Sequence, residues 1–242
     1  MIFKKRNSKS YSILLLSLLV VGFSNKLNAQ EIPHNHLSEF SNEVYGTDDR
    51  LINGKYYKPK HFFALGHPYF KMNEWLPGTL FIKGIPYENI ALKYSIEEDL
   101  IIIKDTYDKA MSKDIVLHNS FVDSLQIEKH LFHNTSNFAN NNPIGYAELI
   151  YRGKTTAYFK HSIEFKDELS DRIKYGKYLK PRKNIYILKE DTFYLIKSKK
   201  EFLNLFSEKQ DELISLIRKN KIRFKKMTDN QLRNLMQITE NL

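Results

Sequence analysis

Short runs of β-branched and aromatic residues recur along residues 78–197, and turn residues separate them. Leu92, Tyr94 and Ile96 alternate with polar neighbours, which is typical of a strand with one buried face. Two further runs flank the turn signal 152–154 and predict an antiparallel hairpin. Because no helical pattern intervenes, we predict an antiparallel β-meander of roughly eight strands, curled as an open or half-closed barrel.

After Ile196 the apolar residues recur at helical spacing. We expect the resulting apolar face, which includes Phe202 and Phe206, to pack on the sheet. Residues 221–225 alternate charged and apolar side chains, which predicts a short edge strand. The predicted fold class is therefore α+β, with C-terminal helices on or beside the meander. Three capping-box signatures place the helix starts: Ser198 with Glu201, Ser207 with Gln210, and Thr228 with Gln231.

The first 29 residues have the three parts of a secretory signal peptide. Lys4 and its basic neighbours precede the apolar run 13–23, and Ala29 supplies a small residue at the cleavage position. The apolar run has 11 residues, whereas a membrane-spanning helix takes about 20. We therefore expect cleavage near Gln30 and export to the periplasm, the outer membrane or the medium. An uncleaved N-terminal anchor is the alternative.

Cleavage would divide the chain into a signal peptide, 1–29, and a single mature domain, 30–242. Residues 30–77 are rich in proline and aromatic residues, and we expect them to wrap around the domain. The meander of 78–197 and the helical tail of 198–242 complete the predicted organisation.

Charge and cysteine content exclude several classes of function. Five of the 38 basic residues and none of the 28 acidic ones lie in residues 1–29, so the net charge falls from +10 to +5 on cleavage. This modest charge gives little reason to expect a nucleic-acid partner. The chain has no cysteine, which excludes disulfides, lipid attachment through cysteine, thiol nucleophiles and cysteine-based zinc sites.

An aromatic segment precedes the predicted meander. Exposed, its rings would stack on sugars or grip an apolar ligand; buried, they would fasten residues 30–77 to the sheet. We expect burial, because a segment without regular pattern needs anchors. The turn signal Asn53-Gly54 predicts a tight hairpin at its start. Seven aromatic residues make up the segment: Tyr56, Tyr57, Phe62, Phe63, Tyr69, Phe70 and Trp75.

Two histidine pairs are the strongest candidates for metal ligands. His34 and His36 would share one side of an extended chain, whereas His130 and His133 would share a face only on a helix. Neither pair has a third partner at a recognisable spacing, and no HExxH motif occurs. We therefore expect neither a bound metal nor a cofactor, and name no metal-binding residue.

Catalytic motifs are also missing from the sequence. It contains no G-x-S-x-G and no phosphate-binding glycine motif. Glu97, Glu98 and Asp99 could supply paired carboxylates for glycoside hydrolysis, but their place between two strands favours a solvated turn. We therefore name no catalytic residue. A basic cluster could face anionic lipid or an acidic polymer, or protect a sheet edge: Lys219, Lys221, Arg223, Lys225 and Lys226.

Several spaced residues resemble those of a group of exported proteins of Gram-negative bacteria that have no assigned activity. This resemblance implies export and a single mature domain, and it implies no activity, cofactor or site. The residues that carry it are Asp48, Asp49, Leu51, Asn53, Gly54 and Tyr57, then Gly66, His67 and Pro68, then Gly84, Tyr87, Asn89, Leu92 and Tyr94, and the tail Ser198, Lys199, Lys200, Phe202 and Leu203.

These observations predict an exported envelope protein that binds a ligand or acts as an accessory or scaffold, without catalysis. Its expected partner is an apolar or polymeric ligand or an envelope protein, and we expect the mature chain not to span the membrane. The alternative is a hydrolase whose histidines or carboxylates converge only on folding. A deep apolar cavity would favour binding, whereas convergence in a cleft would favour the hydrolase.

Overall fold

A computed structural model shows the fold. None of the helices in the described residues combines the length and the apolar character needed to cross a bilayer. The predicted signal peptide and the pair His34 and His36 lie outside the described residues, so these predictions stay predictions. The structure describes residues 54–104, 114–138, 142–168, 170 and 173–241.

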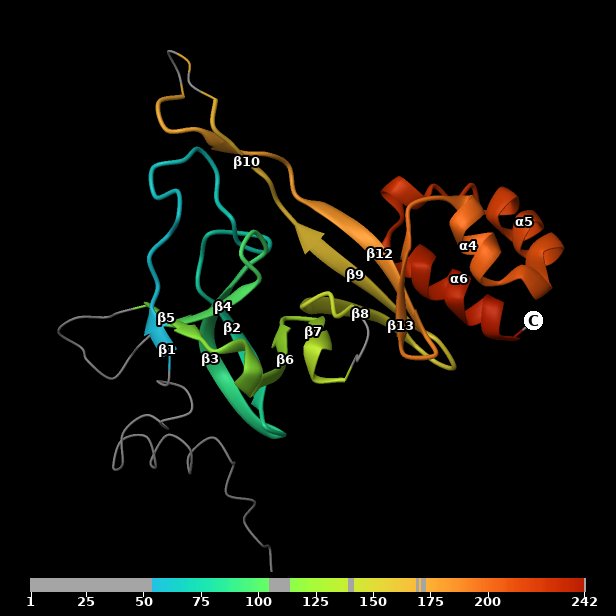
Figure 1. Cartoon of the computed structure of the whole chain (residues 1–242), viewed down its shortest axis with the longest axis horizontal. Coiled ribbons are helices and arrows are strands. Elements are labelled where there is room, and N and C mark those ends of the chain that lie inside the picture. Colours follow the sequence, from blue (N-terminus) through green and yellow to red (C-terminus); the bar gives the residue numbers. More distant parts are fainter. Residues whose placement is uncertain (1–53, 105–113, 139–141, 169, 171–172, 242) are drawn as a thin grey trace, which may run out of the picture. The chain divides into compact units, whose positions relative to one another are not determined.

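The described residues form one large antiparallel sheet, a small two-stranded sheet and three C-terminal α-helices (Figure 1). The large sheet contains β1 (Gly54–Tyr56), β2 (Leu76–Ile82), β3 (Ile85–Ser95), β4 (Leu100–Lys104), β5 (Asp114–Leu117), β6 (Val122–Ile127), β7 (His130–Asn134), β8 (Tyr146–Arg152), β9 (Thr156–Ser162), β12 (Arg182–Lys189) and β13 (Thr192–Ile196). The small sheet pairs β10 (Phe165–Lys166) with β11 (Lys177–Tyr178). The helices are α4 (Lys199–Leu205), α5 (Gln210–Lys219) and α6 (Asp229–Asn241). Short 3-10 helices span Asn119–Phe121, Thr135–Asn137, Ser207–Lys209 and Phe224–Lys226.

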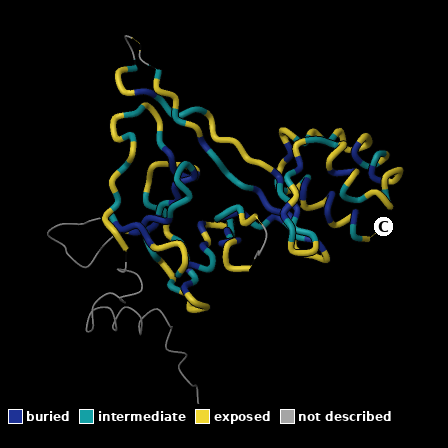
Figure 2. The backbone as a smooth tube through the Cα atoms, in the orientation of Figure 1, coloured by how far each residue is buried: buried dark blue, intermediate teal, exposed yellow. Residues whose placement is uncertain are grey.

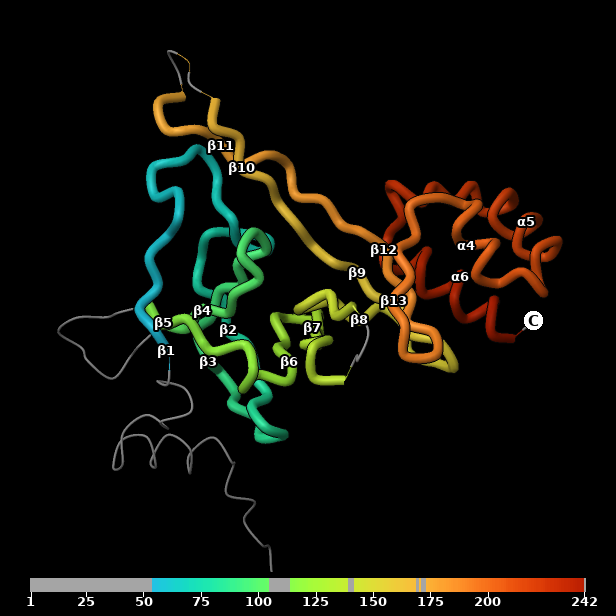
Figure 3. Tube along the Cα trace, in the orientation of Figure 1, coloured from blue at the N-terminus to red at the C-terminus, as the bar shows by residue number. Residues whose placement is uncertain are grey.

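The prediction of an α+β fold built on an antiparallel meander is confirmed, but the predicted number of strands is too small. The large sheet has 11 strands in the order β1-β5-β4-β3-β2-β6-β7-β8-β9-β12-β13, and it is open. The chain meanders from β2 to β5, then returns so that β6 pairs with β2 (Figure 3). β1 lies outside the predicted meander of 78–197, because its three residues are too few for periodicity to indicate a strand.

Local turn chemistry fixes the hairpins. The β8–β9 hairpin predicted around 152–154 is present, and so is the β12–β13 hairpin, whose turn residues Glu190 and Asp191 both have positive φ. The hairpin predicted at Asn53-Gly54 lies partly outside the described residues; its second arm falls on β1, which pairs with β5.

Two large apolar clusters stabilise this sheet, and their buried positions appear dark blue in Figure 2. The first lies among β2 to β8 and includes the fully buried Leu92 and Phe132. The second joins β8, β9, β12 and β13 to the helices, and includes Phe159 and Phe202. The two clusters lie on different parts of the sheet. Polar side chains between them therefore have apolar neighbours on both sides.

The helical tail begins where the sequence predicts. Ser198 and Glu201 form the predicted capping box at α4. Thr228 and Gln231 exchange the same two hydrogen bonds at α6. The signature at Ser207 is wrong, since a 3-10 turn occupies that position and α5 begins at Gln210 without a side-chain cap. The edge strand predicted over 221–225 is also wrong: this stretch leads into the 3-10 helix Phe224–Lys226.

The turn between β3 and β4 is tied to distant strands through Asp99. Its Oδ1 accepts hydrogen bonds from Tyr94 Oη and Lys160 Nζ, both at 2.6 Å. Its Oδ2 accepts from the backbone N–H of Tyr146 at 3.2 Å. Burial lowers the pKa of Lys160 and Asp99 raises it, and burial prevails. One carboxylate therefore joins β3, β8 and β9.

Candidate functional site

Three polar side chains from adjacent strands meet between the two apolar clusters. His130 begins β7, Glu148 lies within β8 and His161 lies near the end of β9. Across the strands, Glu148 pairs with Phe132 of the first cluster and with Phe159 of the second. Because side chains alternate faces along a strand, residues two positions from these partners share the face of Glu148. The sheet register therefore brings both imidazoles to that carboxylate.

The two imidazoles engage both oxygens of the carboxylate. His130 Nδ1 bonds Glu148 Oε1, and His161 Nε2 lies 2.7 Å from Glu148 Oε2. The exposed fractions of the three side chains are 11%, 5% and 14% for His130, Glu148 and His161. The ring of Phe70 packs edge-on against both imidazoles, with centroid distances of 5.3 and 5.0 Å. We call these three residues the His–Glu–His cluster.

A second carboxylate reaches the cluster from the first residue of α6, Asp229. One donor atom from each of His130, Glu148 and Asp229 lies within 4.8 Å of the other two. Lys183 on β12 donates to Asp229 Oδ1 at 2.9 Å. The side chain of Asp229 is 37% exposed, so solvent reaches the cluster from this side.

The surroundings favour the ionised form of both carboxyl groups. Burial raises the pKa of Glu148, but the hydrogen bonds with His161 and His130 outweigh it and hold that pKa below its ordinary value. Burial also raises the pKa of Asp229, and the hydrogen bond from Lys183 outweighs it in the same way. The site therefore brings two anionic carboxylates and two imidazoles together.

The structure separates the predicted pair His130 and His133. Both lie on β7, three positions apart, so they point to opposite faces of the sheet. His133 instead contacts Tyr158 Oη at 3.2 Å and Arg152 Nη2 at 3.4 Å. The helical arrangement that would have made the pair a metal site is absent from this strand.

The acidic run 97–99 is a turn, as the sequence indicates, and it does not form a carboxylate pair for catalysis. Asp99 bonds Lys160, as described above. Glu97 accepts a hydrogen bond from Tyr178 Oη at 2.8 Å and lies 3.6 Å from His61 Nε2. Burial raises the pKa of Glu98, and neighbouring Glu97 adds to that effect. Glu97 and Asp99 thus have separate structural partners.

The aromatic segment is divided between core and surface, so the expectation that it is buried is wrong for part of it. Tyr69 and Phe70 are buried, and Tyr57 and Trp75 pack beside Tyr69. Three of its rings are exposed instead: Tyr56, Phe62 and Phe63. The chain is held at Leu65 by backbone hydrogen bonds with Gly176 and Tyr178. The turn at residues 60–63 precedes this pairing and lies outside the sheet, which leaves Phe62 and Phe63 exposed.

What we call the aromatic surface consists of Phe62 and Phe63 on this turn and of Tyr175, which lies just before β11. Their exposed fractions are 72%, 69% and 60%. Phe63 contacts both neighbours, with ring centroids 5.0 Å from Phe62 and 5.2 Å from Tyr175. Leu65 holds the segment in place through backbone hydrogen bonds with Gly176 and Tyr178 at 3.0 and 2.9 Å.

A pocket of about 370 Å³ lies beside the aromatic surface. Its base includes His61, whose ring stacks on Phe165 at a centroid distance of 3.5 Å. Charged side chains of both signs line it, namely Lys60, Lys174 and Asp167. Aromatic rings and charged side chains of both signs therefore line the same pocket.

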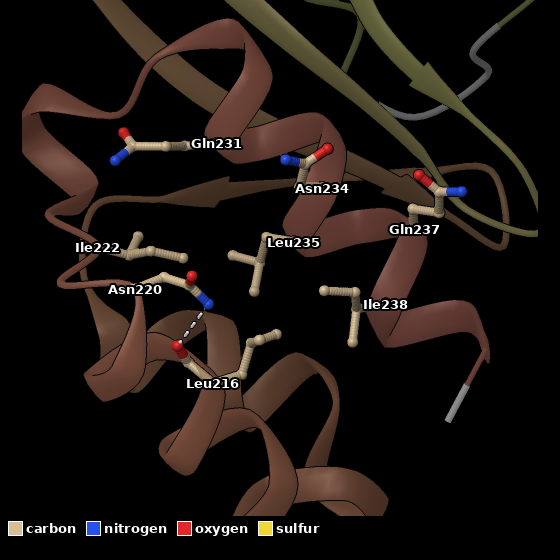
Figure 4. Close-up of a pocket in the computed structure, with 8 residues that line it drawn as sticks. All are labelled: Leu216, Asn220, Ile222, Gln231, Asn234, Leu235, Gln237 and Ile238. Carbon is tan, nitrogen blue, oxygen red and sulfur yellow. Dashed lines mark hydrogen bonds between the residues drawn. The ribbon is translucent and has the colours of Figure 1, made fainter.

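A second pocket, of about 300 Å³, lies between α5 and α6 (Figure 4). Aliphatic and amide side chains line it, and none of its lining residues is charged. Asn220 Nδ2 donates a hydrogen bond to the backbone oxygen of Leu216 at 3.0 Å, so this side-chain amide already has a partner within the protein. The basic cluster predicted from sequence lies apart from this pocket's lining: Arg223, Lys225 and Lys226 line another hollow with Lys197 and Lys199.

A scan against protein-family models and searches of curated proteins and of solved structures found no match to this chain. Function is therefore inferred from the residues themselves.

Sequence reasoning missed Glu148, His161, Asp229 and Tyr175 as site residues. One signal was available: Glu148 lies between Tyr146 and Ile150 at an inward position of its strand, where a charged residue is expensive to bury. No signal announced Asp229, because it reaches the cluster only through the packing of α6 on β8 and β9.

Proposed function

We propose that this chain is an exported envelope protein that acts by binding a protein partner through the aromatic surface, without catalytic turnover. Exposed contiguous apolar side chains are uncommon on soluble domains and mark interaction sites. Three contacting rings that are 60–72% exposed are the observation that carries the proposal. The secretory leader expected over 1–29 supports the location.

The charged residues that line the pocket beside the aromatic surface favour a protein over other partners. Protein interfaces combine an aromatic centre with a polar rim, and here Lys60, Lys174 and Asp167 line the same pocket as the exposed rings. An anionic lipid surface would favour a rim of uniform positive charge. A sugar polymer would favour rings with hydroxyl groups, whereas Phe62 and Phe63 have none and meet at 86°.

Site-specific photo-cross-linking tests the proposal. A photoreactive residue at position 63 should give one discrete protein adduct in the envelope of the native host, and the same residue at Tyr194 should give none. Tyr194 is a matched control, because it is also an exposed ring but lies on β13.

The captured protein should then bind the purified chain directly. Phe63→Ser should weaken that binding about thirtyfold, because truncating a central aromatic anchor costs about 2 kcal/mol. Tyr194→Ser should leave the Kd unchanged. An unchanged Kd for Phe63→Ser would refute the proposal, as would binding to anionic vesicles or to envelope glycans that depends on the same ring.

The hydrolase remains the alternative, and one observation favours it: His130, Glu148, His161 and Asp229 converge. Three of these side chains are at most 14% exposed, which leaves a substrate only the side of Asp229. Hydrolysis of a nitrophenyl ester by the wild-type chain, abolished by Asp229→Asn, would support this alternative. Equal rates for the two proteins would remove it.

A further inference from the structure

We propose that His130, Glu148 and Asp229 bind a divalent transition-metal ion, with His161 as the residue that positions Glu148. The proposal concerns a site distinct from the aromatic surface and does not depend on the protein partner. Three donor atoms already lie within 4.8 Å of one another, so each can reach one ion without movement of the backbone.

Hydrogen bonding alone explains only part of this arrangement. Each imidazole bonds one oxygen of the buried Glu148 carboxylate, so both oxygens have a hydrogen-bond partner. Lys183, and the two imidazoles when they are protonated, also attract Asp229, the second carboxylate that α6 brings to the cluster. Two anionic groups at this separation repel each other, and Lys183 contacts only the more exposed one. A cation between the carboxylates would turn this repulsion into attraction.

The donor set selects the class of ion. An imidazole nitrogen with carboxylate oxygens suits zinc, iron, cobalt or nickel, whereas calcium and magnesium prefer oxygen ligands alone. The chain has no cysteine, so no thiolate competes for the ion. Zinc is the appropriate first probe, since it accepts three or four nitrogen and oxygen ligands.

His161 and Phe70 complete the surroundings of the ion. His161 Nε2 lies 2.7 Å from Glu148 Oε2, which leaves Oε1, on the side of His130, for the ion. Ligating carboxylates are commonly held by such a neighbour, and its loss lowers metal affinity. Phe70 closes the site on the side of the imidazoles, while the exposed side of Asp229 gives the ion an entry path.

Calorimetric titration of zinc into the chelator-treated full chain tests the site. We expect one ion per chain and a rise in the melting temperature on binding, because an ion that binds only the folded state stabilises it. Cobalt should give visible absorption bands that zinc displaces. Failure of the wild-type chain to take up either ion would overturn the proposal and leave a purely hydrogen-bonded junction.

Variants separate this site from adventitious surface binding. Asp229→Asn should lower zinc affinity at least about tenfold. This variant is preferred to Glu148→Gln because Asp229 is at the surface, so the fold is retained. His161→Ala should also weaken binding, and His161→Gln, which can still donate to Glu148, should restore part of it.

His133→Ala is the matched control, because His133 lies on the same strand but on the opposite face. It should leave zinc affinity and stoichiometry unchanged. Zinc uptake that survives Asp229→Asn at full affinity, or that is lost in His133→Ala, would refute the assignment.

Discussion

Asp99 makes contacts with residues far away in the sequence, up to 61 positions at Lys160. It bonds Tyr94, Lys160 and the backbone of Tyr146, and so joins the β3–β4 turn to β8 and β9. Removing one member of a partly buried ion pair leaves the other charge without compensation. We call these contacts the Asp99 anchor. Loss of Asp99 would also leave the partly buried ammonium group of Lys160 without its counter-charge.

Asp99→Ala should lower the free energy of unfolding by about 3 kcal/mol, at the lower end for buried pairs because Asp99 is partly exposed. Urea titration measures the change. Glu164→Ala is the control, since its ion pair with Arg182 is mainly exposed and contributes little. Equal losses in the two variants would show that the Asp99 contacts are not special.

His133 gives the clearest pH dependence. Burial and then the nearby Arg152 lower its pKa from 6.5 to about 4. The unfolded chain therefore takes up the proton first as the pH falls, so the stability contribution is complete above about pH 6.5 and is lost toward about pH 4. The loss is at most about 3 kcal/mol.

Urea titrations at about pH 7 and about pH 4.5 should therefore show a smaller pH-dependent loss in His133→Gln than in the wild-type chain. The same loss in both proteins would mean that other groups cause the acid sensitivity.

At the scale of elements, α6 is fixed to the β8–β9 hairpin by Glu240. Its carboxylate accepts from the backbone N–H of Lys154 at 2.9 Å and of Thr155 at 2.7 Å, and from Tyr151 Oη at 3.0 Å. Glu240→Ala should cost about 1–3 kcal/mol, since buried donors of the turn lose their acceptor. Hydrogen exchange at the amides of Lys154 and Thr155 should accelerate.

Gln237→Ala is the control for this prediction, because it changes an exposed residue of the same helix without touching the hairpin. Unchanged exchange rates in Glu240→Ala would contradict the proposed attachment.

The apolar face predicted for α4 packs in the second apolar cluster, but its two phenylalanines are buried to different extents. Phe202 is fully buried, whereas Phe206 packs against it at 5.0 Å but is only partly buried. Phe202→Ala should therefore cost about 3–5 kcal/mol, and Phe206→Ala clearly less. Thermal or chemical denaturation measures both. The reverse order would show that the helix is rotated relative to the sheet.

Sequence predicted the elements well where one local signal was enough. The caps at Ser198 and Thr228 are visible because each cap and its partner lie three residues apart. Helical spacing also placed Phe202 and Phe206 on the apolar face, but it does not show which of the two lies at the centre of that face. The edge strand expected over 221–225 does not form, because an alternation of charged and apolar residues also occurs in exposed connections between helices.

At the scale of the whole molecule, the sheet order could not be predicted. The return of β6 to β2, and the meeting of His130, Glu148 and Asp229, depend on long-range pairing and on helix packing that leave no fixed spacing in the sequence. The α+β class was predictable, since it follows from the change of period after Ile196 alone.

The second apolar cluster implies that the sheet needs the helices to keep its apolar side chains away from water. A chain ending at residue 197 would expose the strand side chains that now contact α4 to α6, including Phe159 and Ile187. We expect this truncated chain to bind a hydrophobic dye and to aggregate in size-exclusion chromatography. A soluble monomer with a wild-type melting temperature would contradict this view of the core.

The Asp99 anchor also constrains how this protein can vary during evolution. Gly145 has φ of 71°, and a Cβ atom there would lie 1.7 Å from Asp99 Oδ2. Any side chain at position 145 would displace the carboxylate from the backbone of Tyr146. Among relatives, a lineage that keeps the aspartate at position 99 should therefore keep the glycine at position 145. Loss of the aspartate would remove the clash, but the positive φ at position 145 would still favour glycine.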